Sequence, residues 1–203
     1  MFFLFMAVKG ALHPMGPNRF DSYFFMMLLV AIIVGAIPLR QHFYEEKLAK
    51  AAGELINNQF VGVTCLSRFG GIWNWNAAGF VKMGGTEIYL QQSTCNDLRD
   101  YLSDPADANK NMVKDYRAAF GLHVLTHEAM HVAGIYNEQE ADCAAFQRNH
   151  RMAQLLGVPR NISGQSAIVL HRFRPQTRGY YAADCEPGQA RDEKLPDAVW
   201  RGP

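Results

Sequence analysis

The longest uncharged apolar run in the chain is the feature that most restricts its fold. It extends over 17 residues, from Tyr23 to Leu39, without any Asp, Glu, Lys or Arg. As a helix, a run of this length spans roughly 25 Å, slightly less than the hydrocarbon core of a bilayer. Buried helices of soluble proteins rarely extend this far without a polar face. The sequence therefore predicts a membrane helix over residues 23–39.

Two features bear on whether this helix is retained. The small residues Val34-Gly35-Ala36 resemble a signal-peptidase site. However, Pro38 follows that site closely and the run begins unusually far from Met1, which favours an uncleaved anchor. Basic residues occur on both sides of the run, so the positive-inside rule gives no orientation. We expect residues 1–40 to form an N-terminal segment with a single-pass membrane anchor.

The cysteines indicate the compartment. Cys65, Cys95, Cys143 and Cys185 all follow the apolar run, and an even number in a small exported domain is typical of disulfides. Four cysteines allow three pairings. We favour Cys65 with Cys95, which flank the predicted sheet, and Cys143 with Cys185, which would tie the C-terminal tail to a helix. The domain is thus expected outside the cytoplasm; the alternative is a cytosolic domain with four free thiols.

Composition excludes two classes of protein. With 49% hydrophobic and 19% charged residues, the chain is unlike a disordered protein. Its formal net charge of +1 gives it no field typical of a nucleic-acid binder, so no nucleic-acid partner is expected. The length of 203 residues corresponds to about one domain. We assign that domain to residues 41–178 and an irregular C-terminal tail to residues 179–203.

Hydrophobic periodicity predicts an α+β domain that is mainly helical, with a short sheet or hairpin packed on its longest helix. Phe60–Cys65 is typical of a strand, and Gly79–Leu90 of a hairpin that turns at Gly84-Gly85. The strand over residues 86–90 is expected to bind an extended substrate by edge pairing. Helices are expected over residues 41–60, continuing from the anchor, and over 93–102, 107–134, 137–156 and 164–173.

The helix over 107–134 contains an H-E-x-x-H motif, His127-Glu128-Ala129-Met130-His131. Residues four apart project from one helix face, so both imidazoles can bind a single metal ion. Glu128 is turned about 100° from His127, which suits a general base acting on a water better than a third ligand. Gly134 ends the helix three residues later. This pattern predicts metal-assisted hydrolysis with zinc as the cofactor.

The segment after the motif resembles part of the gluzincin group of zincin metallopeptidases. Residues 137–142, Asn-Glu-Gln-Glu-Ala-Asp, are similar to the N-E-x-x-[SA]-D segment of that group. The resemblance implies a zincin-like domain that hydrolyses peptides or proteins, with Glu138 as the third zinc ligand. It also implies that Asp142 orients a ligand histidine. Only six residues separate His131 from Glu138, where gluzincins have a longer insertion.

A second alignment is open for the third ligand. His127 to Asn137 resembles the metzincin signature H-E-x-x-H-x-x-G-x-x-H/D, with Asn137 at the last position. An amide oxygen is a weaker zinc donor than a carboxylate. We therefore favour Glu138, with Asn137, Glu140 or a more distant group as alternatives. If Glu138 is the ligand, Asn137 is expected to cap the following helix.

The chain as a whole also resembles small exported actinobacterial proteins that have a single span and no assigned function. This resemblance implies export and a metal motif, and it leaves the substrate open. The matching residues are His127, Glu128, His131, Gly134, Asn137, Glu138, Cys143, Cys185 and Trp200.

Four further side chains are candidates for the same site. His123 lies one turn before His127, so it can reach a metal, but a structural role in the core is expected. His150, His171 and Tyr136 can stabilise an oxyanion, although we expect them to be structural.

Two other functions compete with a membrane-anchored peptidase. One is a non-catalytic exported surface domain with a structural or vestigial zinc site. A catalytic zinc site keeps an open coordination position, which distinguishes the two. The other is a metal sensor on the cytosolic side, which needs the opposite topology and reduced cysteines.

Overall fold

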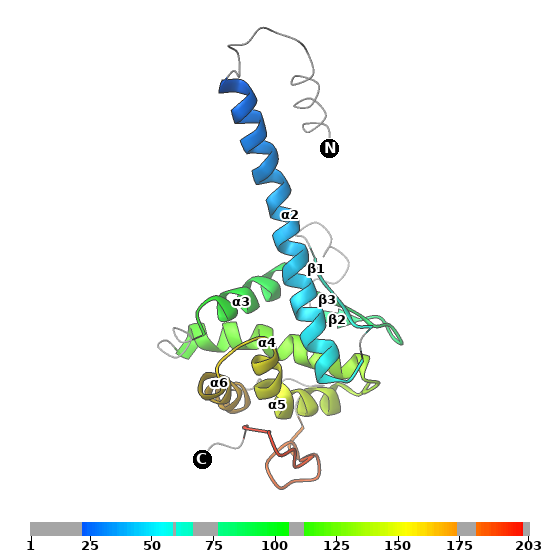
Figure 1. The fold of residues 1–203 in the computed structure, drawn as a ribbon. Coiled ribbons are helices and arrows are strands. Elements are labelled where there is room, and N and C mark those ends of the chain that lie inside the picture. Colours follow the sequence, from blue (N-terminus) through cyan, green and yellow to red (C-terminus); the bar gives the residue numbers. More distant parts are fainter. Residues whose placement is uncertain (1–21, 59, 67–76, 106–111, 174–181, 201–203) are drawn as a thin grey trace. The chain divides into compact units, whose positions relative to one another are not determined.

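The structure is a computed structural model that describes residues 22–58, 60–66, 77–105, 112–173 and 182–200 (Figure 1). The remaining parts of the predicted N-terminal segment, domain and tail lie outside the described residues. The chain divides into two compact units, and the division falls between Tyr44 and Glu45. The described part is mainly helical and has one small sheet, as the hydrophobic periodicity predicted.

Helix α2, Ser22–Leu55, contains the predicted anchor and continues from it as expected, but it ends at Leu55, five residues before the predicted end at residue 60. Its segment Phe25–Leu55 has a mean hydropathy of 1.7 in its most apolar window, none of which is buried. This helix is therefore long and apolar enough to span a membrane or to act as a signal sequence. Its last turns have a different character, because Leu48, Ala51 and Ala52 are buried in the core of the second unit.

The sheet has three short strands: β1, Gly62–Cys65; β2, Gly79–Val81; and β3, Glu87–Leu90. Strands β2 and β3 form the predicted antiparallel hairpin, in which Gly84 adopts a φ of +72° that favours glycine. Strand β1 pairs with β3 in parallel, which places β3 in the centre of the sheet. The expectation that residues 86–90 bind substrate by edge pairing is therefore wrong, because both edges of β3 are already paired.

Four helices follow the sheet: α3, Gln92–Ser103; α4, Met112–Val132; α5, Glu138–Leu155; and α6, Arg160–Arg172. Each was predicted, and α6 begins four residues earlier than expected. The carbonyl of Pro159 accepts from the amides of Ile162 and Ser163, at 3.1 and 2.9 Å, and this closes the first turn directly after the proline.

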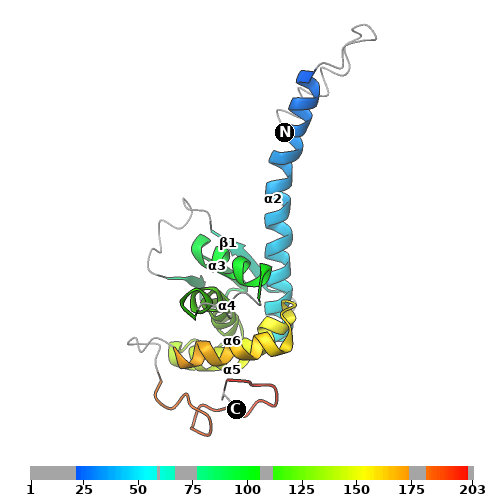
Figure 2. The ribbon, with the colours of Figure 1, turned by 90° about the vertical axis from the view of Figure 1, so that its left-hand side faces the viewer.

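Helix α4 lies in the middle of the second unit. It packs against β2, β3 and α3 on one side and against α5 and α6 on the other (Figure 2). The close approach of α3 requires Gly121, since a Cβ there would lie 2.9 Å from the backbone nitrogen of Leu98. Leu122, Leu125 and Met130 are buried in the resulting core. The helix that bears the H-E-x-x-H motif is thus held from both sides.

Two disulfides reinforce this arrangement, with the pairing predicted from the sequence. Cys65 of β1 is joined to Cys95 of α3, and Cys143 of α5 is joined to Cys185 in the tail. The described tail, residues 182–200, is irregular in secondary structure, as expected. It nevertheless contributes to the core, since Trp200 is only 1% exposed.

Candidate metal centre

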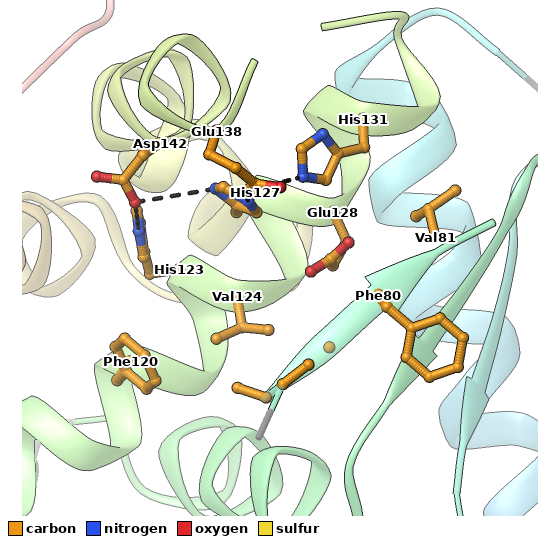
Figure 3. A pocket seen from close by; sticks show the side chains of 13 residues that line it. Phe80, Val81, Phe120, His123, Val124, His127, Glu128, His131, Glu138 and Asp142 are labelled. Carbon is orange, nitrogen blue, oxygen red and sulfur yellow. Dashed lines mark hydrogen bonds and ion pairs between the residues drawn. The ribbon is translucent and has the colours of Figure 1, made fainter. Parts of the chain in front are cut away.

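Helices α4 and α5 bring the side chains of the predicted site together (Figure 3). His127 and His131 lie one turn apart on α4, and Glu138 is the first residue of α5. One donor atom from each of these three residues lies within 4.8 Å of the other two, so that the group could hold a metal ion. The short connection between the helices is therefore long enough to return Glu138 to both histidines.

The distances from the Glu138 carboxylate to the two histidines can be compared with those between the ligands of a metal ion. Glu138 Oε2 lies 3.0 Å from His127 Nε2 and 3.5 Å from His131 Nε2. Two ligand atoms at the usual zinc distances in a tetrahedron are about 3.3 Å apart. The two separations from the Glu138 oxygen lie on either side of that value, which is compatible with an ion shared by the three side chains.

The end of α4 fixes the orientation of His131. Gly134 has a φ of +93°, and the amide of Ile135 donates to the carbonyl of Met130 at 3.1 Å, which closes the helix with a Schellman-type turn. The carbonyl of Ile135 then lies 2.7 Å from His131 Nδ1. Because a carbonyl only accepts, Nδ1 bears the proton and the lone pair of Nε2 faces Glu138.

His127 lies between two carboxylates. Its Nε2 is 3.0 Å from Glu138 Oε2, and its Nδ1 is 3.8 Å from Asp142 Oδ1. Burial lowers the pKa of His127, which favours the neutral ring that metal binding requires. The hydrogen bond to His127 lowers the pKa of Glu138 and keeps that carboxylate ionised. A metal at Nε2 requires the imidazole proton to be on Nδ1, the side that faces Asp142.

A second group of potential ligands shares His127 and adds His123 and Asp142. Here Asp142 Oδ1 lies 2.8 Å from His123 Nε2, which is closer than its 3.8 Å separation from His127. His123 is 5% exposed, and its Nδ1 lies 3.1 Å from the side-chain amide of Asn149. The nearest histidine to Asp142 is therefore His123, which lies outside the motif. The gluzincin resemblance does not suggest this partner.

Glu128 is the most unusual group in the site. It is only 5% exposed, and its Oε2 has no hydrogen-bond partner among the described residues. Burial, and to a smaller extent the charge of Glu138, raise the pKa of the Glu128 carboxyl to about 8. A buried carboxyl oxygen without a hydrogen-bond partner costs free energy, and such groups are concentrated where a protein acts on a ligand.

These side chains open into a cavity of about 440 Å³. Strand β2 forms one wall, and it passes very close to α4. A Cβ on Gly79 would lie 2.9 Å from Val124 Cγ1 and 3.1 Å from Glu128 Cγ. The described residues that line the cavity are Ala77, Ala78, Gly79, Phe80, Val81, Phe120, His123, Val124, His127, Glu128, His131, Glu138 and Asp142.

The remaining predicted residues lie elsewhere. The Asn137 side chain caps α5 by accepting from the amide of Glu140 at 3.1 Å, and Glu140 itself is exposed. His150 is buried with its Nδ1 2.9 Å from the Ser163 hydroxyl. His171 packs edge-on against Trp200. Tyr136 is 57% exposed, and none of these residues is among those that line the cavity in the described part of the chain.

Three features of the site were not foreseen from the sequence: the amide of Asn149, the carbonyl of Ile135 and the close passage of Gly79. A signal existed only for Asn149, which lies seven residues after Asp142 on α5 and so shares its helix face. Neither the carbonyl of Ile135 nor the close approach of Gly79 to α4 produces a recognisable pattern in the sequence. Searches of family models, curated proteins and solved structures gave no match to this chain.

Proposed function

We propose that this protein is a membrane-anchored zinc metallopeptidase, in which a zincin-like domain hydrolyses peptide bonds. The proposal rests mainly on one observation. The buried Glu128 carboxyl has an oxygen without a partner among the described residues, and it lines the same cavity as His127, His131 and Glu138. A base poised beside a set of metal donors is the arrangement that metal-assisted hydrolysis requires.

The donor set supports zinc as the ion. His127, His131 and Glu138 supply two imidazole nitrogens and one carboxylate oxygen, a combination found in catalytic zinc sites that keep one position open. The carbonyl of Ile135 orients His131, as partners of metal-bound histidines commonly do. When bound, zinc would polarise a substrate carbonyl and lower the pKa of a coordinated water to about 7.

Glu128 would carry out both proton transfers of the reaction. Its carboxylate would accept a proton from the attacking water as the new C–O bond forms. The same carboxyl would then donate that proton to the leaving amine as the C–N bond breaks. A pKa raised by burial suits both steps, because a group whose pKa is near the working pH accepts and donates protons with similar ease. A bound cation would draw that pKa back down.

Strand β2 is the element that favours an extended peptide as substrate. It pairs with β3 and has no second strand partner in the described part of the chain. Main-chain hydrogen bonding along such an edge is one way in which proteins bind an extended peptide. Gly79, Phe80 and Val81 of this strand line the cavity next to Glu128. A peptide paired along β2 would therefore present its backbone carbonyls to the metal donors. We therefore assign substrate pairing to β2 in place of residues 86–90.

Helix α2 and the disulfides support a location for the domain outside the cytoplasm. The apolar part of α2 suits a single-pass anchor. Both disulfides lie in the second unit, and disulfides persist in oxidising compartments. We infer that the domain faces the outside of the cell membrane, with exported or surface proteins as its substrates.

The test is to replace Glu128 by Gln in the full chain purified in detergent. The variant keeps the side-chain shape and is expected to retain zinc, because Glu128 is outside the ligand group. Its rate should fall by about 10² to 10⁴-fold, the usual contribution of general acid–base catalysis. Incubation with a peptide library, followed by mass spectrometry of the products, first identifies a substrate and then measures this loss.

Glu140→Gln is the matched control, because Glu140 is an exposed glutamate near the site that should keep full activity. A wild-type protein that binds zinc tightly and cleaves nothing would favour the non-catalytic surface domain. A Glu128→Gln variant as active as the wild type would remove Glu128 from the mechanism.

A further inference from the structure

His123 has no role in the proposed reaction. Each of its two ring nitrogens nevertheless lies within hydrogen-bond distance of a polar side chain. Its Nδ1 lies 3.1 Å from Asn149 Nδ2, and its Nε2 lies 2.8 Å from Asp142 Oδ1. The ring is 5% exposed and is part of the cavity wall (Figure 3). A buried histidine with two directional partners has a defined tautomer, which can be deduced from those partners.

The amide of Asn149 determines that tautomer. An amide nitrogen only donates, so Nδ1 of His123 is the acceptor and its proton is on Nε2. The Nε2–H group then donates to the Asp142 carboxylate. Both ring nitrogens are satisfied without any metal ion, and this argues against His123 as a ligand.

The bond from His123 restricts Asp142 to one orientation. The oxygen that accepts from His123 is also the one that lies 3.8 Å from His127 Nδ1. If this bond were lost, the carboxylate could rotate away from His127 or turn into the cavity. Held in place, the carboxylate keeps a negatively charged oxygen on the Nδ1 side of His127, where the imidazole proton must reside if Nε2 binds a metal.

Packing holds the ring of His123 in its plane. Phe146 of α5 stacks on it, with ring centroids 4.3 Å apart and an interplanar angle of 22°. Phe146 in turn contacts His171, which packs edge-on against Trp200. The position of His123 is therefore set jointly by hydrogen bonds and by the aromatic core.

We propose that His123, fixed by Asn149, is a positioning residue that holds Asp142 in the orientation needed to align His127 for metal binding. This inference rests on the proposed zinc centre. It accounts for a row of four polar side chains that spans α4 and α5, the buried Asn149, His123 and His127 and the half-buried Asp142.

Two substitutions separate hydrogen bonding from packing. His123→Gln keeps an N–H donor for Asp142 and loses the aromatic ring. His123→Phe keeps a ring that can stack on Phe146 and loses both nitrogens. We expect His123→Phe to weaken zinc binding by about 10 to 100-fold, the range for partners that orient a ligand. His123→Gln should retain most of the affinity. A role confined to packing predicts the reverse order.

The measurement is competitive titration of the full chain in detergent with Zn²⁺ and Co²⁺, and the absorption spectrum of Co²⁺ reports ligand geometry. If His123 acts through Asp142, then Asp142→Ala combined with His123→Phe should bind no more weakly than Asp142→Ala alone. The matched controls are Phe and Gln at His150, which is equally buried outside the cavity and should leave the affinity unchanged.

The possible outcomes are distinct. Equal affinity in wild type and His123→Phe, or fully additive losses in the double variant, would overturn the positioning role. Two metal ions per wild-type chain and one in both His123 variants would make His123 a ligand. A wild-type chain that binds neither metal would overturn the zinc centre itself, and the inference with it.

Discussion

Several histidines of the second unit are distinguished by the atoms that lie beside their ring nitrogens. His131 faces a backbone carbonyl, His123 faces an amide and a carboxylate, and His150 faces the Ser163 hydroxyl. His150 is 2% exposed, and burial lowers its pKa. A neutral, buried imidazole makes folding sensitive to acid, because the unfolded chain accepts a proton that the folded chain resists.

The first prediction concerns this acid sensitivity. The folded pKa of His150 is below its unfolded value of about 6.5, so its contribution destabilises the fold as the pH falls below about 6.5. The unfolding free energy of the wild type should therefore decrease more between pH 7.5 and pH 5 than that of His150→Gln. Urea denaturation of both chains with a chelator present measures the difference. His42→Gln, at an exposed position, is the control, and identical pH profiles in wild type and His150→Gln would contradict the prediction.

At the level of secondary structure, the start of α5 decides which residue reaches the metal site. Asn137 has an extended backbone, and its side chain accepts from the amide of Glu140. Glu138 is consequently the first helical residue, and its side chain turns back toward α4. The same asparagine that resembles a metzincin ligand position thus serves as a cap.

The second prediction separates a cap from a ligand. Asn137→Ala should lower the unfolding free energy by about 1 kcal/mol, the usual cost of losing an N-cap, and should weaken zinc binding only slightly. Glu138→Ala should weaken zinc binding far more, because it removes a donor. Asn137→Asp keeps the capping oxygen and is the control for stability. Loss of zinc in Asn137→Ala with retention in Glu138→Ala would assign the third ligand to Asn137 instead.

For the whole molecule, the tail is a structural part of the second unit. The disulfide at Cys185 and the buried ring of Trp200 attach it to α5 and α6. Arg148 also forms a two-pronged ion pair with Glu193, with both distances 2.6 Å, although its exposure limits its contribution. Residues of the tail also share a buried hydrophobic cluster with α4, α5 and α6. Its members are Ala119, Cys143, Phe146, Leu170, Ala182, Cys185 and Trp200.

The third prediction is that Cys143→Ala with Cys185→Ala destabilises the protein and loosens the tail. The disulfide closes a separation of 42 residues, for which loop entropy predicts about 4 kcal/mol. Urea denaturation measures the loss. Hydrogen exchange should increase over residues 182–200 and stay low in β1, whose disulfide remains. Unchanged exchange in the tail would show that Trp200 and its neighbours hold it without the disulfide.

The fourth prediction concerns topology. If the second unit is outside the cytoplasm, all four cysteines of the full chain in its native membrane should resist a thiol reagent until a reductant is added. An extracellular protease should also cleave the second unit in intact cells. Four reactive thiols without reductant would place the domain in the cytosol and would favour the metal sensor.

The sequence by itself determined the features that depend on local geometry. Helical and strand periodicity predicted the helices and the hairpin, and the spacing of His127 and His131 placed both on one face of α4. The prediction that Asn137 caps α5 is confirmed, because a cap involves only residues a few positions apart. The disulfide pairing also followed from the order of the predicted elements.

Only the tertiary structure decided the features that depend on how distant segments pack. The parallel pairing of β1 makes β3 central and leaves β2 at the edge beside Glu128. The separation and rotation of α4 and α5 bring Asp142 closer to His123 than to His127, and they join Asn149 to the same chain of hydrogen bonds. The burial of Glu128, one oxygen of which has no hydrogen-bond partner among the described residues, likewise arises from the surrounding elements. Such arrangements are set by backbone separations between helices and strands, and no local spacing encodes those separations.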